Sequence, residues 1–257
     1  MDQDYYSIGE LAEISGTTVR TIQYYDQIGL LEAKRSESNL RYYTQFDLVK
    51  LQQILFYKRV DFPLKEIKEL VRNVNSNNDL VQVLERQSVI LFQKEMEIKM
   101  NQVIIDVVKS TLEGDPETDL EPLIKLILGL EKQTIMDYNK IDYGIESDQN
   151  FDVSNIQIES VLEMYWDWKQ LVLEASNLKL NHTDIESQSG YEIGKRWHEF
   201  LKKVEGDNTQ IRQAAEKGAE FSEQWPKEDL FLYNFSEDFI EDAYQYYLKK
   251  KEGKQDD

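Results

Sequence analysis

Cysteine is absent from this sequence of 257 residues, and histidine occurs only twice. Without cysteine, no disulfide, thiol redox switch or cysteine-ligated metal site can form. Two isolated histidines also argue against a histidine-rich metal site. The sequence therefore predicts neither a metal centre nor a cofactor.

Long apolar runs are missing as well. No uninterrupted stretch approaches the roughly 18 apolar residues that indicate a membrane span. The first ten residues, MDQDYYSIGE, lack the basic and apolar regions of a secretion signal. We therefore expect a cytoplasmic protein with no membrane partner.

Catalytic signatures are scarce too. His182 and His198 lie in unrelated segments, and no nucleophile accompanies either of them. Gly190 and Gly194 do not make a phosphate-binding loop. We expect that the chain is not an enzyme.

The net charge of −19 is unevenly distributed. Residues 1–72 hold 10 Lys and Arg against 11 Asp and Glu, and residues 73–112 hold 4 against 5. The remaining −17 belongs to residues 113–257. The first third can therefore approach nucleic acid, whereas the acidic remainder disfavours it and suits a cationic or amphipathic ligand or simple solubility.

The first 31 residues predict two short helices separated by a tight break. Ser7 and Glu10 have capping-box spacing, and Ser15-Gly16 ends the helix that they begin. Thr17 is then expected to cap a second helix, in which Arg20 carries a guanidinium fork suited to phosphate or a guanine edge. This order is typical of a helix-turn-helix, although a short amphipathic helix with one arginine is, by itself, usually just a surface helix.

The next segment, EAKRSESNLRYY at residues 32–43, predicts a β-hairpin wing. Asn39 tolerates the left-handed backbone of a tight turn, and the flanking arms carry basic and aromatic residues. A solvated basic loop is the alternative. Beyond the wing, Thr44 and Pro63 each mark a helix start, so residues 5–72 are expected to run helix, helix, wing, helix, helix.

The segments SIGELAEISGTTVRTIQYYDQIGLL and LRYYTQFDLVKLQQILFYKRVDFPLKEIKEL resemble the DNA-binding domain of the mercury-resistance regulator (MerR) family. The resemblance covers nearly all of the first 72 residues. It implies that the threonines of the second helix meet DNA and that its arginine and tyrosines, with those of the wing, contact phosphates and grooves. The candidate DNA-binding residues are Thr17, Thr18, Arg20, Thr21, Tyr24, Tyr25, Lys34, Arg35, Arg41, Tyr42 and Tyr43.

A long helix is expected from Asp79 to Leu112, because apolar residues recur there every seven positions. The repeat consists of Leu84, Leu91, Ile98, Ile105 and Leu112. A neighbouring row, Gln87, Lys94 and Asn101, is too polar for a long parallel zipper. A single buried helix is one interpretation. The resemblance implies the other, an antiparallel coiled coil in a homodimer that binds a palindromic operator on double-stranded promoter DNA.

The Gly114–Pro116 break separates this helix from a region that again looks helical. We expect helices over 120–138, 156–178, 189–204, 208–224 and 236–250, with a polar loop at 142–152. The predicted fold is mainly α. Its domains are a winged helix-turn-helix domain at 1–76, a dimerisation helix at 77–113 and an all-α effector-binding domain at 114–257.

Aromatic residues crowd three of the C-terminal helices and lie beside carboxylates. Such rings could form a pocket for a bulky apolar or cationic compound, or they could simply build a core. The candidate effector-binding residues are Tyr165, Trp166, Trp168, Tyr191, Trp197, Phe200, Tyr244 and Tyr247. This region is also similar to the helical ligand-binding domain of the thiostrepton-responsive and multidrug-responsive members of the family, notably at YNFSEDFIEDAYQYY.

Together these features predict a ligand-responsive, sequence-specific transcription regulator. The resemblance implies an activator that senses a drug-like hydrophobic or cationic small molecule and distorts promoter DNA until RNA polymerase can use it. The alternative is a constitutive DNA-binding regulator whose C-terminal domain binds a protein partner.

Overall fold

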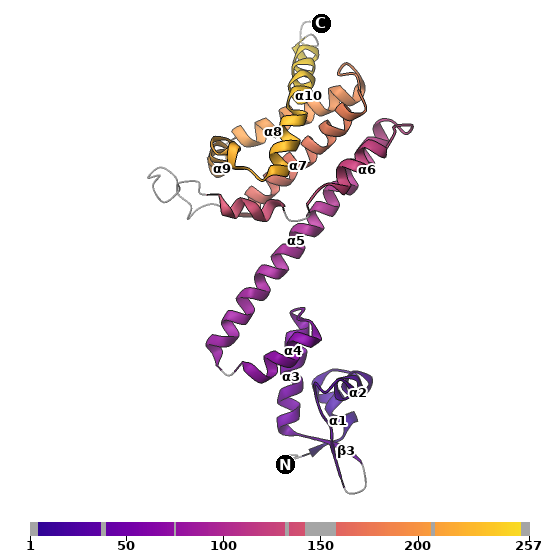
Figure 1. The fold of residues 1–257 in the computed structure, drawn as a ribbon, viewed down its shortest axis with the longest axis vertical. Helices are drawn as coiled ribbons and strands as arrows, with labels where there is room; N and C mark the ends of the chain where they lie inside the picture. The colour runs from indigo at the N-terminus through magenta and orange to yellow at the C-terminus, as the bar shows by residue number, and fades with distance from the viewer. Residues whose placement is uncertain are drawn as a thin grey trace. The chain divides into compact units, whose positions relative to one another are not determined.

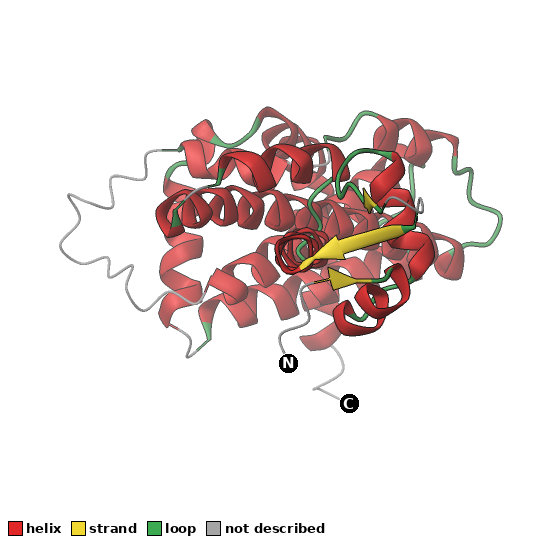
Figure 2. Cartoon of the chain, turned by 90° about the horizontal axis from the view of Figure 1, so that it is seen from below, coloured by secondary structure: helices red, strands yellow, loops and turns green. Residues whose placement is uncertain are grey.

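The computed structural model describes residues 5–36, 40–74, 76–131, 134–141, 158–206 and 209–252 (Figure 1). The predictions of a turn at Asn39 and of a polar loop at 142–152 lie outside the described residues. The chain divides into two compact units, with the boundary between Leu91 and Phe92. The described part is mainly helical, with only short strands (Figure 2), as the sequence predicted. None of its helices is long and apolar enough to cross a bilayer.

The N-terminal unit contains short strands and helices in alternation. Its elements are β1 (Tyr5–Tyr6), α1 (Ile8–Ser15), α2 (Val19–Gln27), β2 (Lys34–Arg35), β3 (Arg41–Thr44), α3 (Gln45–Arg59) and α4 (Leu64–Asn73). Ser7 and Thr44 cap α1 and α3 through reciprocal bonds with Glu10 and Asp47. These capping boxes satisfy first-turn amides that a helix leaves unpaired, which fixes where both helices begin.

The wing belongs to a three-stranded sheet in the order β1-β3-β2. Tyr6 in β1 pairs with Tyr43 in β3, and Lys34 in β2 pairs with Tyr42. The strand at Tyr5–Tyr6 was not predicted, because two residues are too few to show alternation. It gives β3 a partner on both edges and ties the wing to the start of α1.

One local prediction in this unit was wrong. The N-cap of α2 is Thr18, whose hydroxyl accepts from the amide of Thr21 at 3.1 Å, and not Thr17. Ile22 and Tyr25, three positions apart, provide the buried face of the helix, whereas 38% of the Val19 surface is exposed.

Helices make up the remainder of the described chain. They are α5 (Asn77–Gly114), α6 (Glu121–Leu128), η1 (Thr134–Lys140), α7 (Ile158–Leu180), α8 (Gln188–Glu205), α9 (Thr209–Glu220), η4 (Ser222–Gln224) and α10 (Lys227–Glu252). The single helix expected over 120–138 is wrong, since α6 ends at Leu128 and a separate 3₁₀ helix begins at Thr134. Gly129 follows α6 directly, and a glycine at this position disfavours extension of the helix.

Helix α5 contributes to two hydrophobic cores. Near its start, Val83 packs in the core of the N-terminal unit. The Gln87 amide is buried beside it and donates to the Val60 carbonyl at 2.8 Å. Further along, Val103 and Val107 are buried in the core of the C-terminal unit. Each unit is therefore completed by one segment of the same helix.

Helices α8 and α10 approach each other closely at Gly194. A Cβ atom placed there would lie 2.2 Å from the carbonyl oxygen of Ala243. No side chain fits at that distance, so glycine is what allows the two backbones to meet.

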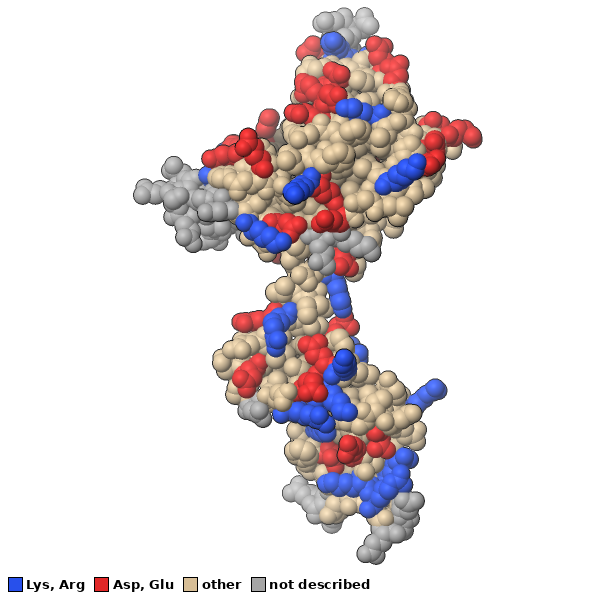
Figure 3. All heavy atoms as spheres, in the orientation of Figure 1, with Lys and Arg blue, Asp and Glu red and all other residues tan. Residues whose placement is uncertain are grey.

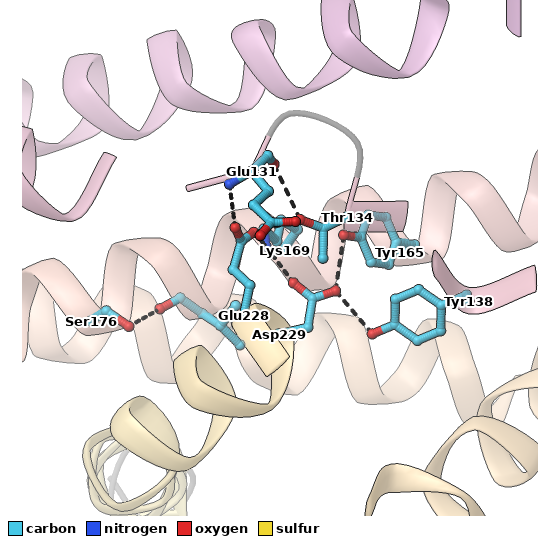
Figure 4. A network of polar contacts seen from close by, with 9 residues as sticks. Glu131, Thr134, Tyr138, Tyr165, Lys169, Ser176, Glu228 and Asp229 are labelled. Carbon is cyan, nitrogen blue, oxygen red and sulfur yellow. Dashed lines mark hydrogen bonds and ion pairs between the residues drawn. The ribbon is translucent and has the colours of Figure 1, made fainter. Parts of the chain in front are cut away.

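A buried polar network joins α7 to the first turn of α10 (Figure 4). The Lys169 ammonium is fully buried and pairs with Asp229 and, at 2.6 Å, with Glu228. The hydroxyls of Tyr165 and Tyr138 donate to Asp229 at 3.0 and 2.9 Å. Every charge in the network therefore has a partner, which is the condition for keeping charges out of water.

The same network holds the segment around η1. Thr134 donates to the Glu228 carboxylate at 3.0 Å, and the Glu131 amide donates to it as well. The pKa of Tyr165 is raised well above its usual value, mainly by burial and further by the neighbouring Asp229 carboxylate. The Tyr165 hydroxyl consequently keeps its proton at physiological pH and remains a donor.

Gly194→Ala should destabilise the protein, because the added methyl group must push α8 away from α10. We expect a loss of about 1–3 kcal/mol in the free energy of unfolding. Gly218→Ala in α9 is the matched control, since nothing lies within 4 Å of a Cβ there. It should leave stability unchanged or raise it by up to about 1 kcal/mol. Urea unfolding followed by circular dichroism checks both, and equal midpoints would contradict the close approach.

Lys169→Met should be more damaging, because it leaves two carboxylates in the network without their ammonium. Breaking a buried ion pair in this way costs about 3–5 kcal/mol. The control is Lys195→Met. The Lys195 side chain is 43% exposed, and its ammonium lies as far as 3.9 Å from Glu192, so this ion pair is weak. That change should cost under about 1 kcal/mol. Tryptophan fluorescence during urea unfolding reports the difference; similar losses in both variants would argue against the network's contribution.

Candidate nucleic-acid interface and ligand site

Helix α2 presents a polar surface to solvent. Thr18, Arg20 and Tyr24 are exposed, and Thr21 is half-buried beside them. The hydroxyl oxygens of Thr18 and Thr21 lie 2.8 Å apart. The result is a short row of donors and acceptors next to one fixed positive charge, which suits the edge of a DNA groove.

Three basic residues of the wing lie beside that helix. Lys34, Arg35 and Arg41 are all exposed, and Arg35 stands directly opposite Arg41 in the β2–β3 pair. The Asp26 carboxylate, 3.3 Å from Arg41, offsets part of the repulsion between these two like charges. The exposed cationic groups of the wing remain suited to phosphate oxygens.

Asp26, near the end of α2, connects the wing to the helix. Its carboxylate lies 3.3 Å from Nε of Arg41 and accepts from the Ala33 amide at 3.1 Å. It thereby fixes the direction of Arg41 relative to α2. Sequence reasoning missed Asp26. Its signal is an acidic residue in the last turn of a helix, a place that the helix dipole disfavours unless a specific partner compensates.

The charge distribution on the surface agrees with this arrangement. On the face drawn in Figure 3, Lys and Arg side chains gather over the end of the N-terminal unit that carries β3. Within the C-terminal unit the same view shows more Asp and Glu. The basic area of the N-terminal unit thus coincides with the wing.

Two of the predicted DNA-contact residues lie elsewhere. Tyr25 is 5% exposed and Tyr43 is fully buried, so both rings belong to the hydrophobic core. Burial raises the pKa of both phenols. The prediction that these rings face DNA does not fit their position. Tyr42 is half-buried with its ring edge-on to Tyr5, and Thr17 is half-buried ahead of α2.

The heptad residues of α5 form a stripe that is largely exposed. Relative exposures are 39% for Leu91, 58% for Ile98, 58% for Ile105 and 37% for Leu112. Leu84, the first of the series, instead packs partly against the N-terminal core. Four apolar side chains aligned along one helix and open to water favour a partner surface over a solvated face.

The eight aromatic residues predicted for an effector site are distributed over the core of the C-terminal unit and its edge. Trp168 and Tyr247 are buried, and the other six are half-buried. Tyr165, Trp166, Trp197 and Phe200 pack against the core. Tyr191 and Tyr244 contact rings on facing helices, Tyr247 and His198 respectively. Core packing therefore accounts for most of the set.

A cavity of about 530 Å³ lies elsewhere in the same unit, and none of these eight residues lines it. Its walls come from the end of α5, the end of α7 and the start of α8. Sequence reasoning missed it, because its polar side chains resemble ordinary surface residues in each of the three segments. Among the described residues, no group of three or more His, Cys, Asp or Glu could hold a metal ion.

Comparison with known proteins supports the assignment of the N-terminal unit. Residues 6–74 match the description of a MerR HTH family regulatory protein. The transcriptional activator TipA of Streptomyces coelicolor is 49% identical over 67 residues, which are 26% of either chain. The transcriptional activator mta of Bacillus subtilis is 37% identical over 111 residues, which are 43% of this chain and 42% of that protein.

A solved structure of the N-terminus of the Bacillus subtilis multidrug transporter activator is 37% identical and covers 42% of this chain and 98% of its own, with a TM-score of 0.36. The chain thus matches about a quarter of the length of TipA and less than half of the length of mta. The family match at residues 6–74 covers the capped helices, the exposed face of α2 and the wing described above. Residues 6–74 therefore form a helix-turn-helix domain of the MerR family of regulatory proteins.

Proposed function

We propose that this protein is a ligand-responsive, sequence-specific transcription regulator that binds promoter DNA as a homodimer. The observation that carries the proposal is the juxtaposition of the exposed face of α2 with the basic wing, held together by the contacts of Asp26. The two curated relatives named above are both transcriptional activators, which favours activation for this chain also.

The surface residues divide into two kinds of DNA contact. Arg20, Lys34, Arg35 and Arg41 are suited to phosphates, where they set position and register. Thr18, Thr21 and Tyr24 are suited to base edges in the major groove, which a recognition helix enters. Tyr25 and Tyr43 support this surface from the core.

The exposed stripe on α5 is assigned to dimerisation. A second copy of the same stripe, running antiparallel, would cover Leu91, Ile98, Ile105 and Leu112 with an identical set. A two-fold axis of that kind presents two recognition helices to a palindromic operator. Activation would then follow from distortion of the promoter, so that RNA polymerase can use it.

We assign DNA binding to residues 1–76, dimerisation to 77–113 and effector binding to 114–257. The C-terminal unit is suited to sensing because it contains a cavity and carries most of the negative charge. A small-molecule effector would act there.

Arg20→Ala should weaken binding to every DNA sequence and reduce the salt dependence of the association constant, because one phosphate contact is lost. The slope of log K against log salt should fall by about 1. Arg212→Ala in α9 is the control, with the same chemical change in the acidic unit. Fluorescence anisotropy on promoter fragments at several salt concentrations measures both; an unchanged slope for Arg20→Ala would remove this residue from the interface.

The double change Ile98→Glu, Ile105→Glu should yield a monomer, because two pairs of carboxylates would face each other in the coiled coil. Val89→Glu is the control: this residue is 53% exposed on α5 but lies outside the heptad row. Light scattering of each purified protein gives the mass. A dimer of the double variant, or a monomer of the unaltered protein, would contradict the assignment of the stripe.

A further inference from the structure

The cavity in the C-terminal unit has an unusual lining for a ligand site. Of its seventeen lining residues, nine carry hydroxyl or amide side chains, four are carboxylates, one is an arginine and none is aromatic. Pockets for drug-like molecules are mostly apolar and rich in aromatic rings. Side-chain methylene groups together with Leu178 and Ile193 also supply apolar surface, so the lining suits a molecule that carries polar groups on a carbon skeleton.

The back of the cavity is formed by buried polar side chains. Glu174 and Asn177, one turn apart on α7, are 6% and 1% exposed. The Asn177 amide donates to the Thr111 hydroxyl at 2.9 Å, and the Ser110 hydroxyl donates to Glu174 at 3.0 Å. These bonds connect α7 to α5 and hold the polar groups at fixed positions, so little ordering remains to be done when a ligand binds.

A third helix is fixed to the same wall. Arg196 of α8 pairs with the second oxygen of Glu174. The start of α8 is equally constrained, since a Cβ on Gly190 would lie 2.1 Å from the carbonyl oxygen of Ile185. The three walls of the cavity are therefore tied together by polar bonds and close backbone contact.

The charge of the lining favours a cation. Arg196 is matched by Glu174, and the other three carboxylates leave a net charge of −3. Glu113 and Asp115 are exposed at the C-terminal end of α5, where the helix dipole adds partial negative charge. At the opposite wall, Ser187 caps the start of α8 by accepting from the Gly190 amide, and the backbone amides of a first helical turn suit neutral oxygen atoms.

We propose that this cavity binds an amino sugar, a molecule whose ammonium groups meet the acidic end of α5 while its hydroxyls meet the polar walls. The inference rests on the proposed function, because it names the class of effector that the regulator senses. It replaces the aromatic pocket expected from the sequence. Since Ser110 and Thr111 adjoin Leu112 of the exposed stripe, an occupant would brace the end of the dimerisation helix against α7 and α8.

Isothermal titration of the full chain with kanamycin, a polyhydroxylated amine, tests the proposal. We expect one molecule per chain. The double variant Glu113→Gln, Asp115→Asn should bind about 10-fold more weakly or worse, as expected for loss of charge-assisted hydrogen bonds. Both residues are exposed, so folding should be preserved. The matched control, Glu117→Gln with Glu121→Gln, removes the same charge outside the lining and should bind as the unaltered protein does.

Two further probes separate the parts of the proposed chemistry. Maltotriose has the hydroxyls without the amines, and spermidine has the amines without the hydroxyls; each should bind at least about 10-fold more weakly than kanamycin. Absence of kanamycin binding, equal binding by the lining variant, or equal binding of either probe would overturn the proposal. Promoter binding measured on the same preparations keeps the outcomes distinct, since intact DNA binding without kanamycin binding rejects the ligand class and leaves the regulator standing.

Discussion

One helix supplies buried side chains to both hydrophobic cores of this protein, and the rest of the structure depends on that sharing. Val83 of α5 completes the core of the N-terminal unit, and Val107 completes that of the C-terminal unit. Gln87 interrupts the apolar pattern of α5 for a structural reason: its side-chain amide donates to the Val60 carbonyl at the end of α3. With two faces committed to cores, the heptad stripe is the face left for another molecule.

Much of the N-terminal unit could be predicted because its signals are local. Capping boxes at Ser7 and Thr44 fix helix starts within four residues of sequence, and Gly16 adopts the left-handed backbone that ends α1. The predictions that failed in this unit concern features that depend on contacts between residues distant in the sequence. The β1 strand exists because β3 offers it an edge, and the burial of Tyr43 follows from that pairing and not from its neighbours in the chain.

The C-terminal unit was harder to predict, because helical periodicity shows which residues face inward but not whether a core or a cavity lies there. Aromatic residues on three helices predicted a pocket, yet Trp168 and Tyr247 are buried in packing contacts. The acidic composition likewise concealed the buried Lys169, whose partners lie some 60 positions along the chain. The walls of the polar cavity come from three segments, and only the fold brings them together.

The paired hydroxyls at the start of α2 limit how many hydrogen-bond donors this helix could present to bases in the proposed DNA complex. Thr18 already accepts from the Thr21 amide, and the 2.8 Å contact between their oxygens uses the hydrogen of one hydroxyl. While that contact persists, the pair has a single hydrogen left to offer a base. In the proposed DNA complex the two threonines would then offer bases one hydrogen-bond donor besides their remaining acceptor lone pairs, so the contact between the hydroxyls halves the number of donors that this pair can present.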